Sequence, residues 1–486
     1  MSIRVSVVGA GVIGAAVARE LSKYEDIEVH VVEREADVGW GVSKANTGII
    51  HAGYDDDPEM YPLRAGLCRM GNELWRGIVA QLHIPALWCG SLVLAFDEQE
   101  RRTLEELRER GVRNKVKGLK ILDRGLCLEL EPNLSDEILE GMWAPTAGVI
   151  SPYEAVVALA ENAVENGARL HLETTVKSIC VKEGRVTGLE TDNGFLRSDF
   201  VVNASGLFGD LLSKTAGVDD FSIRPRKGEY FLFDKDVSPK VDVTLFRVPK
   251  PTTKGVVVTQ TADGNLLVGP NARDLSGHER DATNTTRDGL DEVWREAAKM
   301  VSSLPPRHSA IRTFAGLRPE PDGGDFIIRT YDEPFGLLNC VGMRSPGLTS
   351  APAVALKVVD MLRGLGVPLT LKAHWKASRE PIVKFRELST AEKDNLISSN
   401  PSYGKVVCSC ELVTEAEVIE AIRRGAGTLD SIKFRTRAGM GRCQGSFCVP
   451  KLLALLCRET GKPVEEITLK GSGSELVKGR VGRELT

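Results

Sequence analysis

The sequence predicts an α/β fold, in which a Rossmann-type domain is joined to an antiparallel β cap domain and a small helical C-terminal domain. Three observations support this prediction. A glycine motif lies between an apolar strand and a helix near the N-terminus, short strand-like runs dominate residues 222–310, and closely spaced cysteines flank two expected helices after residue 400. The length of 486 residues suffices for about three domains.

Residues 4–33 have the pattern of a strand, a helix and a second strand. The first strand ends in GAGVIG, where Gly9 permits the turn, Gly11 lets a pyrophosphate approach the backbone and Gly14 lets the helix pack close to the sheet. The helix start offers N–H groups and partial positive charge to phosphates. Glu33 ends the second strand, where a carboxylate can accept from both ribose hydroxyls. The pattern therefore predicts a dinucleotide site; the structural alternative is a glycine-rich turn of an unrelated α/β domain.

Composition excludes several classes of protein. The chain is 42% hydrophobic and 27% charged, as in ordinary soluble globular proteins. The net charge of −4 argues against broad nucleic-acid binding. No stretch is long and apolar enough to suggest a membrane span, and no secretory signal is seen, so we expect a cytoplasmic protein. Ten cysteines in that compartment indicate reduced thiols or metal ligands before disulfides.

Residues 34–54 do not continue a regular pattern and include SKANTGIIHAGY. Small residues, amides and hydroxyls at this density suit a segment that lies along a ligand. His51 within it has two interpretations: a buried, hydrogen-bonded structural histidine, or a functional group beside the dinucleotide site. Both stay open at this point.

The middle of the chain alternates helices with strands. A helix should begin at Ser151, because serine stands at the N-cap, proline at N1 and glutamate at N3. The apolar run that ends in VVNASG, residues 200–206, predicts a central parallel strand whose carboxyl end meets a ligand. Further helices are expected at 61–81 and 98–109, and further strands at 169–173, 176–181 and 186–191.

The strand-like runs of residues 222–310 predict the antiparallel cap sheet, with a turn that places Lys254 at the start of a strand. An apolar strand at 337–341 then leads into GMRSPGLT and a helix at 351–362, whose N-terminal dipole can face an electron-rich ring. We expect the following domains: Rossmann-type, 1–85, 141–221 and 311–371; cap, 86–140 and 222–310; linker, 372–402; C-terminal domain and tail, 403–486.

Cys408, Cys410, Cys443 and Cys448 form two closely spaced pairs with two expected helices between them. Four thiolates suit zinc or an iron–sulfur cluster on chemistry alone. The spacings CxC and Cx4C differ from the usual zinc-ribbon CxxC, and the surrounding glycines supply backbone N–H groups for cluster sulfurs. Lys433, Arg435, Arg437 and Arg442 can balance an anionic cluster. The pattern favours 2Fe–2S; zinc, or an empty or disulfide site, is the alternative.

These motifs resemble two known families. GAGVIG, NTGIIHAGY, VVNASG, AGLRP and MRSPGLT occur in the same order as in FAD-dependent oxidoreductases of the D-amino-acid-oxidase type, over about residues 3–370. The tail, with CSC and GRCQGSFC, resembles the bacterioferritin-associated-ferredoxin-like 2Fe–2S domain. Together they resemble the catalytic subunit of anaerobic or archaeal FAD-dependent glycerol-3-phosphate dehydrogenases. The cofactors implied are FAD and a 2Fe–2S cluster.

The resemblance also implies roles for residues. His51 would be the catalytic base, and Arg318 would bind an anionic group of the substrate. The membrane-bound relatives carry a second arginine where this chain reads AGYDDD, so Lys254 is the candidate replacement. The cysteines above would hold the cluster. The FAD contacts implied are Gly9, Gly11, Val12, Ile13, Gly14, Glu33, Arg34, Ser43, Asn46, Thr47, Gly48, Ile49, Val176, Ala204, Ser205, Gly206, Gly316, Arg344, Pro346, Gly347, Leu348 and Thr349.

The function expected from this resemblance is oxidation of sn-glycerol 3-phosphate to dihydroxyacetone phosphate, with the hydride passing to flavin N5. Electrons would leave through the cluster to a partner subunit in a hetero-oligomeric complex, peripheral to a membrane if the partner is bound there. A 2-hydroxyglutarate, amine or proline dehydrogenase would use the same scaffold. A non-catalytic electron-transfer or assembly subunit is the alternative from another class.

Overall fold

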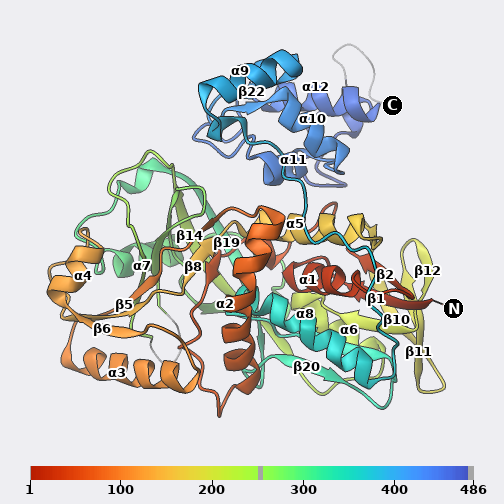
Figure 1. Ribbon diagram of the computed structural model, residues 1–486, viewed down its shortest axis with the longest axis horizontal. Coiled ribbons are helices and arrows are strands. Elements are labelled where there is room, and N and C mark those ends of the chain that lie inside the picture. Colours follow the sequence, from red (N-terminus) through yellow and green to blue (C-terminus); the bar gives the residue numbers. More distant parts are fainter. Residues whose placement is uncertain (1, 250–254, 480–486) are drawn as a thin grey trace. The chain divides into compact units, whose positions relative to one another are not determined.

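The computed structural model describes residues 2–249 and 255–479, and the chain forms two compact units (Figure 1). The first comprises Met1–Val32 and Gly39–Arg379, and the second comprises Glu33–Val38 and Glu380–Thr486. Each unit has its own hydrophobic core. None of the helices in the described ranges is long and apolar enough to cross a membrane.

A six-stranded sheet forms the centre of the dinucleotide-binding part of the first unit. Its order is β20 (Ile327–Thr330), β21 (Leu337–Val341), β13 (Phe200–Asn203), β1 (Ile3–Val8), β2 (Ile27–Val32) and β9 (Arg169–His171). All neighbours are parallel except β20 and β21. Strand order reverses between β1 and β13, where Val8 pairs with Asn203. Such a reversal opens a crevice at the carboxyl ends of the strands.

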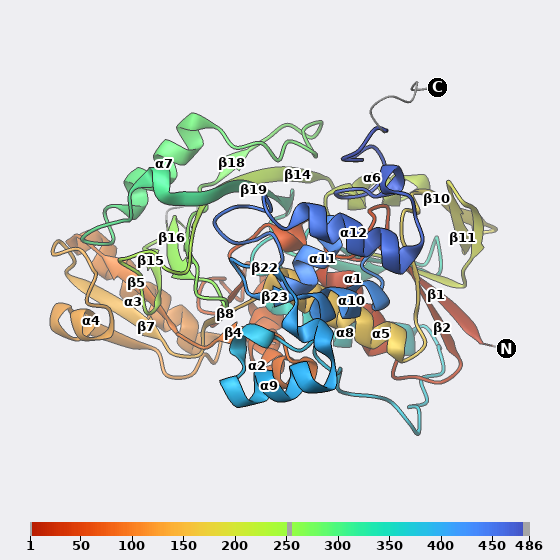
Figure 2. The ribbon, with the colours of Figure 1, turned by 90° about the horizontal axis from the view of Figure 1, so that it is seen from above.

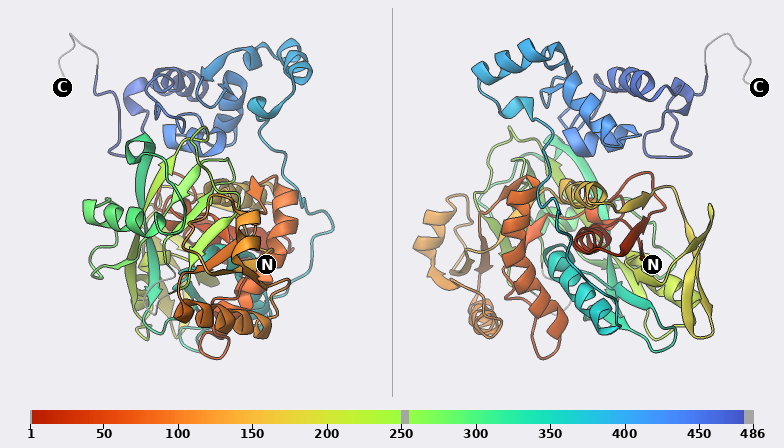
Figure 3. Two further views of the ribbon diagram at one scale, coloured as in Figure 1. Left: turned by 90° about the vertical axis from the view of Figure 1, so that its left-hand side faces the viewer. Right: turned by 45° about the vertical axis from the view of Figure 1, so that its right-hand side comes forward.

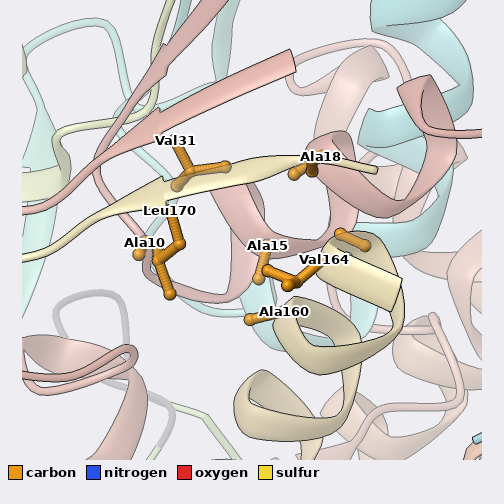
Figure 4. Close-up of a pocket in the computed structure, with 9 residues that line it drawn as sticks. Ala10, Ala15, Ala18, Val31, Ala160, Val164 and Leu170 are labelled. Carbon is orange, nitrogen blue, oxygen red and sulfur yellow. The ribbon is translucent and has the colours of Figure 1, made fainter. Parts of the chain in front are cut away.

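Helix α1 (Val12–Leu21) lies between α5 (Pro152–Glu165) and α8 (Gly347–Gly364), and α8 packs against α2 (Pro62–Leu82) (Figures 1 and 3). All ten residues of α1 are buried, and four of them are alanine or glycine. Their small side chains let the flanking helices approach. A gap remains between α1 and α5, and the nine residues that line it, all alanine, valine or leucine, offer no polar group to a ligand (Figure 4).

The cap sheet has nine strands. Its order is β18 (Arg273–Asp274), β14 (Ile223–Phe233), β17 (Leu266–Val268), β16 (Val257–Gln260), β15 (Thr244–Arg247), β5 (Ser91–Ala95), β7 (Glu140–Ala144) and β6 (Lys120–Asp123), with β19 (Ala310–Pro321) paired to β14 (Figure 2). Residues 314–319, which include the AGLRP motif, are part of the twelve-residue strand β19. The sheet is antiparallel as predicted, except that β15 runs parallel to β5.

Smaller elements complete the first unit. Two three-stranded sheets are formed, one by β10 (Val176–Lys182), β11 (Arg185–Thr191) and β12 (Gly194–Arg197), the other by β3 (Ile49–Ile50), β8 (Gly148–Ile150) and β4 (Ala86–Leu87). The remaining helices are α3 (Glu98–Arg113), α4 (Arg124–Leu130), α6 (Gly209–Thr215) and α7 (Arg287–Ala297). Helix α3 continues one turn beyond the end that its sequence suggested.

The second unit is small and mainly helical, with α9 (Thr390–Ser399), β22 (Val406–Cys408), β23 (Val413–Thr414), α10 (Glu415–Arg423), α11 (Leu429–Thr436) and α12 (Val449–Thr460). Helix α10 begins with a capping box formed by Thr414 and Glu417. The linker prediction missed α9, which begins with a second capping box formed by Ser389 and Glu392. The helix has no buried residue, so no apolar face marked it in the sequence.

Candidate functional site

The glycine motif connects β1 to α1 at the reversal of strand order. The Ala204 N–H donates to the Val8 carbonyl at 2.9 Å, which places the ends of β1 and β13 side by side. A Cβ on Gly9, whose φ is +99°, would lie 2.6 Å from the Ala204 carbonyl oxygen, and one on Gly14 would lie 1.9 Å from the Gly9 oxygen. Only glycine allows this packing. The close helix–sheet approach predicted at Gly14 is therefore present.

The segment expected to follow the ligand folds back on the start of α1. The Val12 N–H donates to Ser43 Oγ at 2.9 Å, so Ser43 lies at the N-terminal end of the helix. Asn46 Nδ2 donates to the Ser43 carbonyl at 2.8 Å, and Asn46 Oδ1 accepts from the Gly48 N–H at 2.8 Å. Asn46 thus fixes the turn that positions Thr47. A Cβ on Gly316 would lie only 1.9 Å from the Ala45 carbonyl oxygen, so β19 meets this loop closely.

The other residues expected to contact the cofactor lie in several places. Ser205 Oγ donates to Asn203 Oδ1 at 2.6 Å, and Gly206, with φ at +61°, faces open space. Val176 packs with Val8 and Val32 at the ends of their strands. Glu33 directly follows β2 and accepts the Glu35 N–H at 3.0 Å, and the neighbouring Arg34 is exposed. Ile49 and Leu348 belong to β3 and the first turn of α8, respectively.

His51 lies among polar groups from two segments of the chain, residues 51–55 and 345–349. Its Nδ1 lies 3.8 Å from Asp55 Oδ2, and its Nε2 lies 3.3 Å from Ser345 Oγ. Its backbone N–H donates to Thr349 Oγ1 at 3.0 Å, in the first turn of α8. The imidazole is 13% exposed. A histidine held by a carboxylate on one ring nitrogen presents the other nitrogen for proton transfer.

Arg318 lies on β19 and has no carboxylate partner among the described residues. Its Nη2 donates to the carbonyls of Asn271, at 2.7 Å, and Lys227, at 3.4 Å, while its Nε is buried without a hydrogen-bond partner. Burial lowers the pKa of Arg318 from its ordinary value. An arginine nevertheless stays protonated, so this cation needs an anion. Tyr230 lies nearby, and burial raises its pKa to about 12, so its hydroxyl stays neutral.

Arg344, one residue before Ser345, has a partner of its own. Its Nη1 pairs with Glu320 at 2.9 Å, and Glu320 also lies 3.8 Å from Arg226. Burial lowers the pKa of Arg344. The expected contact of Arg344 with the cofactor would have to compete with this ion pair. Lys254, the other predicted cation, lies outside the described residues.

The four cysteines of the second unit come together as two pairs. Cys410 Sγ lies 3.5 Å from Cys443 Sγ, and the Cys448 thiol donates to Cys408. That bond lowers the pKa of Cys408 to about 6 and raises the pKa of Cys448. Backbone N–H groups of Gly439 and Glu411 also point to Cys408. A Cβ on Gly441 would lie 2.3 Å from Cys410 Cβ, so glycine is required where the two loops meet.

The sulfur pairs and their N–H donors fit an iron–sulfur cluster, which takes four cysteine ligands. Within the described ranges, no group of three or more Cys, His, Asp or Glu side chains is arranged so that it could hold a single metal ion. Three of the four cations expected to balance the cluster have carboxylate partners in this unit: Arg437 pairs with Glu411 at 2.9 Å, Arg435 with Asp37, and Lys433 with Asp430 at 3.4 Å.

Family models match both parts of the chain. The model described as FAD dependent oxidoreductase (DAO) matches residues 4–361, about three quarters of the chain. The chain belongs to this family of FAD-dependent oxidoreductases. The model of the BFD-like [2Fe-2S] binding domain matches residues 406–458 of this oxidoreductase, which include all four cysteines. FAD and a 2Fe–2S cluster are therefore its cofactors, as predicted.

Three relatives describe the oxidoreductase further. It is 42% identical, over 99% of both chains, to "Glycerol 3-phosphate dehydrogenase" of Caloramator mitchellensis. It is 26% identical to "Anaerobic glycerol-3-phosphate dehydrogenase subunit A1" of Haloferax volcanii, over 98% of this chain and 86% of the relative. The solved structure of dithionite-reduced L-α-glycerophosphate oxidase from Mycoplasma pneumoniae with FAD bound matches with a TM-score of 0.72 and 32% identity, over 79% of this chain and all of that one.

Two residues of the oxidoreductase site were missed in the sequence. Asp55, the partner of His51, lies in the run DDD, which was interpreted only as the place of a missing arginine. A carboxylate four residues after a histidine was the available signal. Ser345 lies inside the MRSPGLT motif, but its approach to His51 joins segments 294 residues apart and left no local signal.

Proposed function

We propose that this protein oxidises sn-glycerol 3-phosphate to dihydroxyacetone phosphate and passes the electrons to a separate protein subunit. FAD, when bound, supplies a hydride acceptor at flavin N5, and the 2Fe–2S cluster supplies a carrier of single electrons. The names of the relatives support the substrate, and the subunit named in Haloferax volcanii supports a multi-subunit complex.

The position of His51 carries the proposal. His51 Nδ1 lies 3.8 Å from Asp55 Oδ2, so a neutral ring that carries its proton on Nδ1 would present Nε2 as a proton acceptor on the side of Ser345. We assign His51 as the base that removes the proton from the C2 hydroxyl, and Ser345 as the hydroxyl that orients it. The hydrogen bond from the His51 backbone to Thr349 holds the base against the start of α8.

Arg318 is assigned to the phosphate of the substrate. Its guanidinium has no carboxylate partner in the described part of the chain, and its buried Nε lacks a hydrogen bond. A dianionic phosphate would supply both the missing charge and the missing acceptor. Lys254 remains the candidate for a second cation.

The remaining assignments concern FAD. Gly9, Gly11 and Gly14 would receive the pyrophosphate at the start of α1, and the carboxylate that directly follows β2 would bind the ribose. Because glycine at positions 9 and 14 allows the end of β1, the Ala204 carbonyl and the start of α1 to pack closely, the turn has the form of a dinucleotide-binding turn, which supports this assignment. The segments Asn46–Gly48 and Pro346–Thr349 would follow the flavin ring.

The test is an anaerobic titration of the purified holoenzyme, monitored through its visible spectrum. Glycerol 3-phosphate should bleach the flavin at stoichiometric concentration, while 2-hydroxyglutarate and proline should leave it oxidised. Bleaching by 2-hydroxyglutarate or proline alone would replace the proposed substrate, since a carboxylate also satisfies Arg318. Failure of all three would favour a non-catalytic subunit.

A further inference from the structure

The surface above the cysteine pairs differs from the rest of the second unit. Cys408 and Cys448 are buried, whereas Cys410 and Cys443 are partly exposed. The edge defined by Cys410 and Cys443, whose sulfurs are 3.5 Å apart, is therefore where a cluster held by these residues comes nearest to solvent. An external electron acceptor has its shortest approach at this edge.

A phenylalanine is held outward beside this edge. Phe447 is 80% exposed, the highest value among large apolar side chains in the described residues. Its backbone N–H donates to Cys443, and the next residue is the buried Cys448. These two neighbours fix the backbone at Phe447 beside the exposed sulfur pair. Leu412, two residues after Cys410, is 36% exposed and adds a second apolar side chain from the other cysteine loop.

The exposed charges of the two cysteine loops have one sign. Within residues 408–412 and 442–451, the exposed charged residues are Arg442 and Lys451. The acid in these loops, Glu411, is 1% exposed and pairs with Arg437 and Arg386. An apolar centre with a basic rim thus lies on a chain whose net charge is −4. Such a surface complements an apolar patch ringed by carboxylates.

We propose that Phe447, Leu412, Arg442 and Lys451 form the docking surface for the protein that accepts the electrons, a small redox protein with an acidic rim around an apolar patch. The proposal deepens the proposed function and rests on its statement that electrons leave to a separate protein. Small interfaces with complementary charges are typical of electron-transfer pairs. Phe447 is the apolar anchor, and the two cations steer the encounter.

The experiment uses full-length holoenzyme reduced with dithionite, so that its outcome is independent of the substrate. Reduced protein is mixed in a stopped-flow instrument with plant plastocyanin, an acidic blue-copper protein, or with cytochrome c, a basic acceptor. Phe447→Ser should slow plastocyanin reduction about tenfold, the effect of losing one anchor from a small interface. Arg442→Glu should also slow it and weaken its dependence on salt. The matched control is Phe195→Ser, which removes a phenylalanine 56% exposed on β12 in the first unit and should change nothing.

Binding is measured separately by titration with zinc-substituted plastocyanin, which accepts no electrons. Phe447→Ser should weaken this binding by the same factor while iron content and the cluster spectrum stay at wild-type values. Equal rates for Phe447→Ser and wild type, or faster reduction of cytochrome c than of plastocyanin, would overturn the proposal. Slower flavin-to-cluster transfer in Phe447→Ser, with unchanged plastocyanin reduction, would overturn it too, because the ring would then serve the chain's own first unit.

Discussion

Arg318 is a cation that the described part of the chain leaves without a carboxylate, and its two donated hydrogen bonds go to backbone carbonyls. Arg344 differs from it, because its guanidinium is neutralised by an ion pair with Glu320. The contrast supports the proposed anion-binding role of Arg318.

Replacing Arg318 with lysine should raise KM for glycerol 3-phosphate by about 10- to 100-fold and change kcat much less, because a point charge replaces a planar fork of donors. Steady-state assays with a dye acceptor measure both constants. The matched control is Arg312→Lys, at an exposed position of the same strand, where KM should not change. An unchanged KM in Arg318→Lys would remove the assignment.

Replacing His51 with glutamine should lower kcat by about 10²- to 10⁴-fold, the usual contribution of a positioned base, with a small effect on KM. Asp55→Asn should give a smaller loss, because the ring stays but its orienting carboxylate is gone. Rapid-reaction measurement of flavin bleaching isolates this step. If His51→Gln bleached at the wild-type rate, His51 would be a structural histidine after all.

At the scale of elements, the contact between the two cysteine loops depends on the absence of a side chain at Gly441. Gly441→Ala would bring a Cβ within 2.3 Å of Cys410 Cβ, so the variant should lose most of its iron and sulfide. Gly427→Ala is the matched control, because a Cβ there meets nothing within 4 Å. Iron analysis and visible absorption measure the result; full iron content in Gly441→Ala would show that the loops can separate.

Strands β2 and β9 are joined by a pair of histidines. His30 Nδ1 lies 3.0 Å from His171 Nε2, and the rings are stacked with Glu28 and Arg169 nearby. Burial lowers the pKa of both histidines, so below a pH of about 6.5 the unfolded chain binds more protons than the folded one. Stability should therefore fall as pH decreases from 7 to 5.

The variant His171→Asn should make the melting temperature depend less on pH between 5 and 7. The variant His278→Asn, at an exposed position, should leave the pH dependence of the melting temperature unchanged. Thermal scans at pH 5, 6 and 7 make the comparison. Parallel pH curves for wild type and His171→Asn would mean that other groups control acid stability.

The elements also show how far the sequence could be read. Glycine spacing, caps and apolar runs predicted the Rossmann-type core and the cysteine domain, because these signals are local. The parallel pairing of β15 with β5, and the approach of Ser345 to His51, join segments about 150 and 300 residues apart, respectively, and no local pattern encodes them. Helix α9 was missed for the opposite reason: it has a clear capping box but no apolar face.

At the scale of the whole molecule, the two units have separate cores, and each receives its own cofactor. Calorimetry should therefore resolve two unfolding transitions. Added FAD should raise only the first unit's transition, and removal of iron with a chelator should lower only the second unit's. A single transition that responds to both treatments would show that the units unfold together.

The guanidinium of Arg318, which has no carboxylate partner within residues 2–249 and 255–479, has a practical consequence. A lone cation of this kind does not recognise a carbon skeleton, so inorganic phosphate and sulfate should occupy it in competition with any organic phosphate. Phosphate buffer would then lower the apparent affinity for glycerol 3-phosphate in an assay. Crystals grown from ammonium sulfate would carry an oxyanion at this arginine, marking the position where the reactant's headgroup belongs.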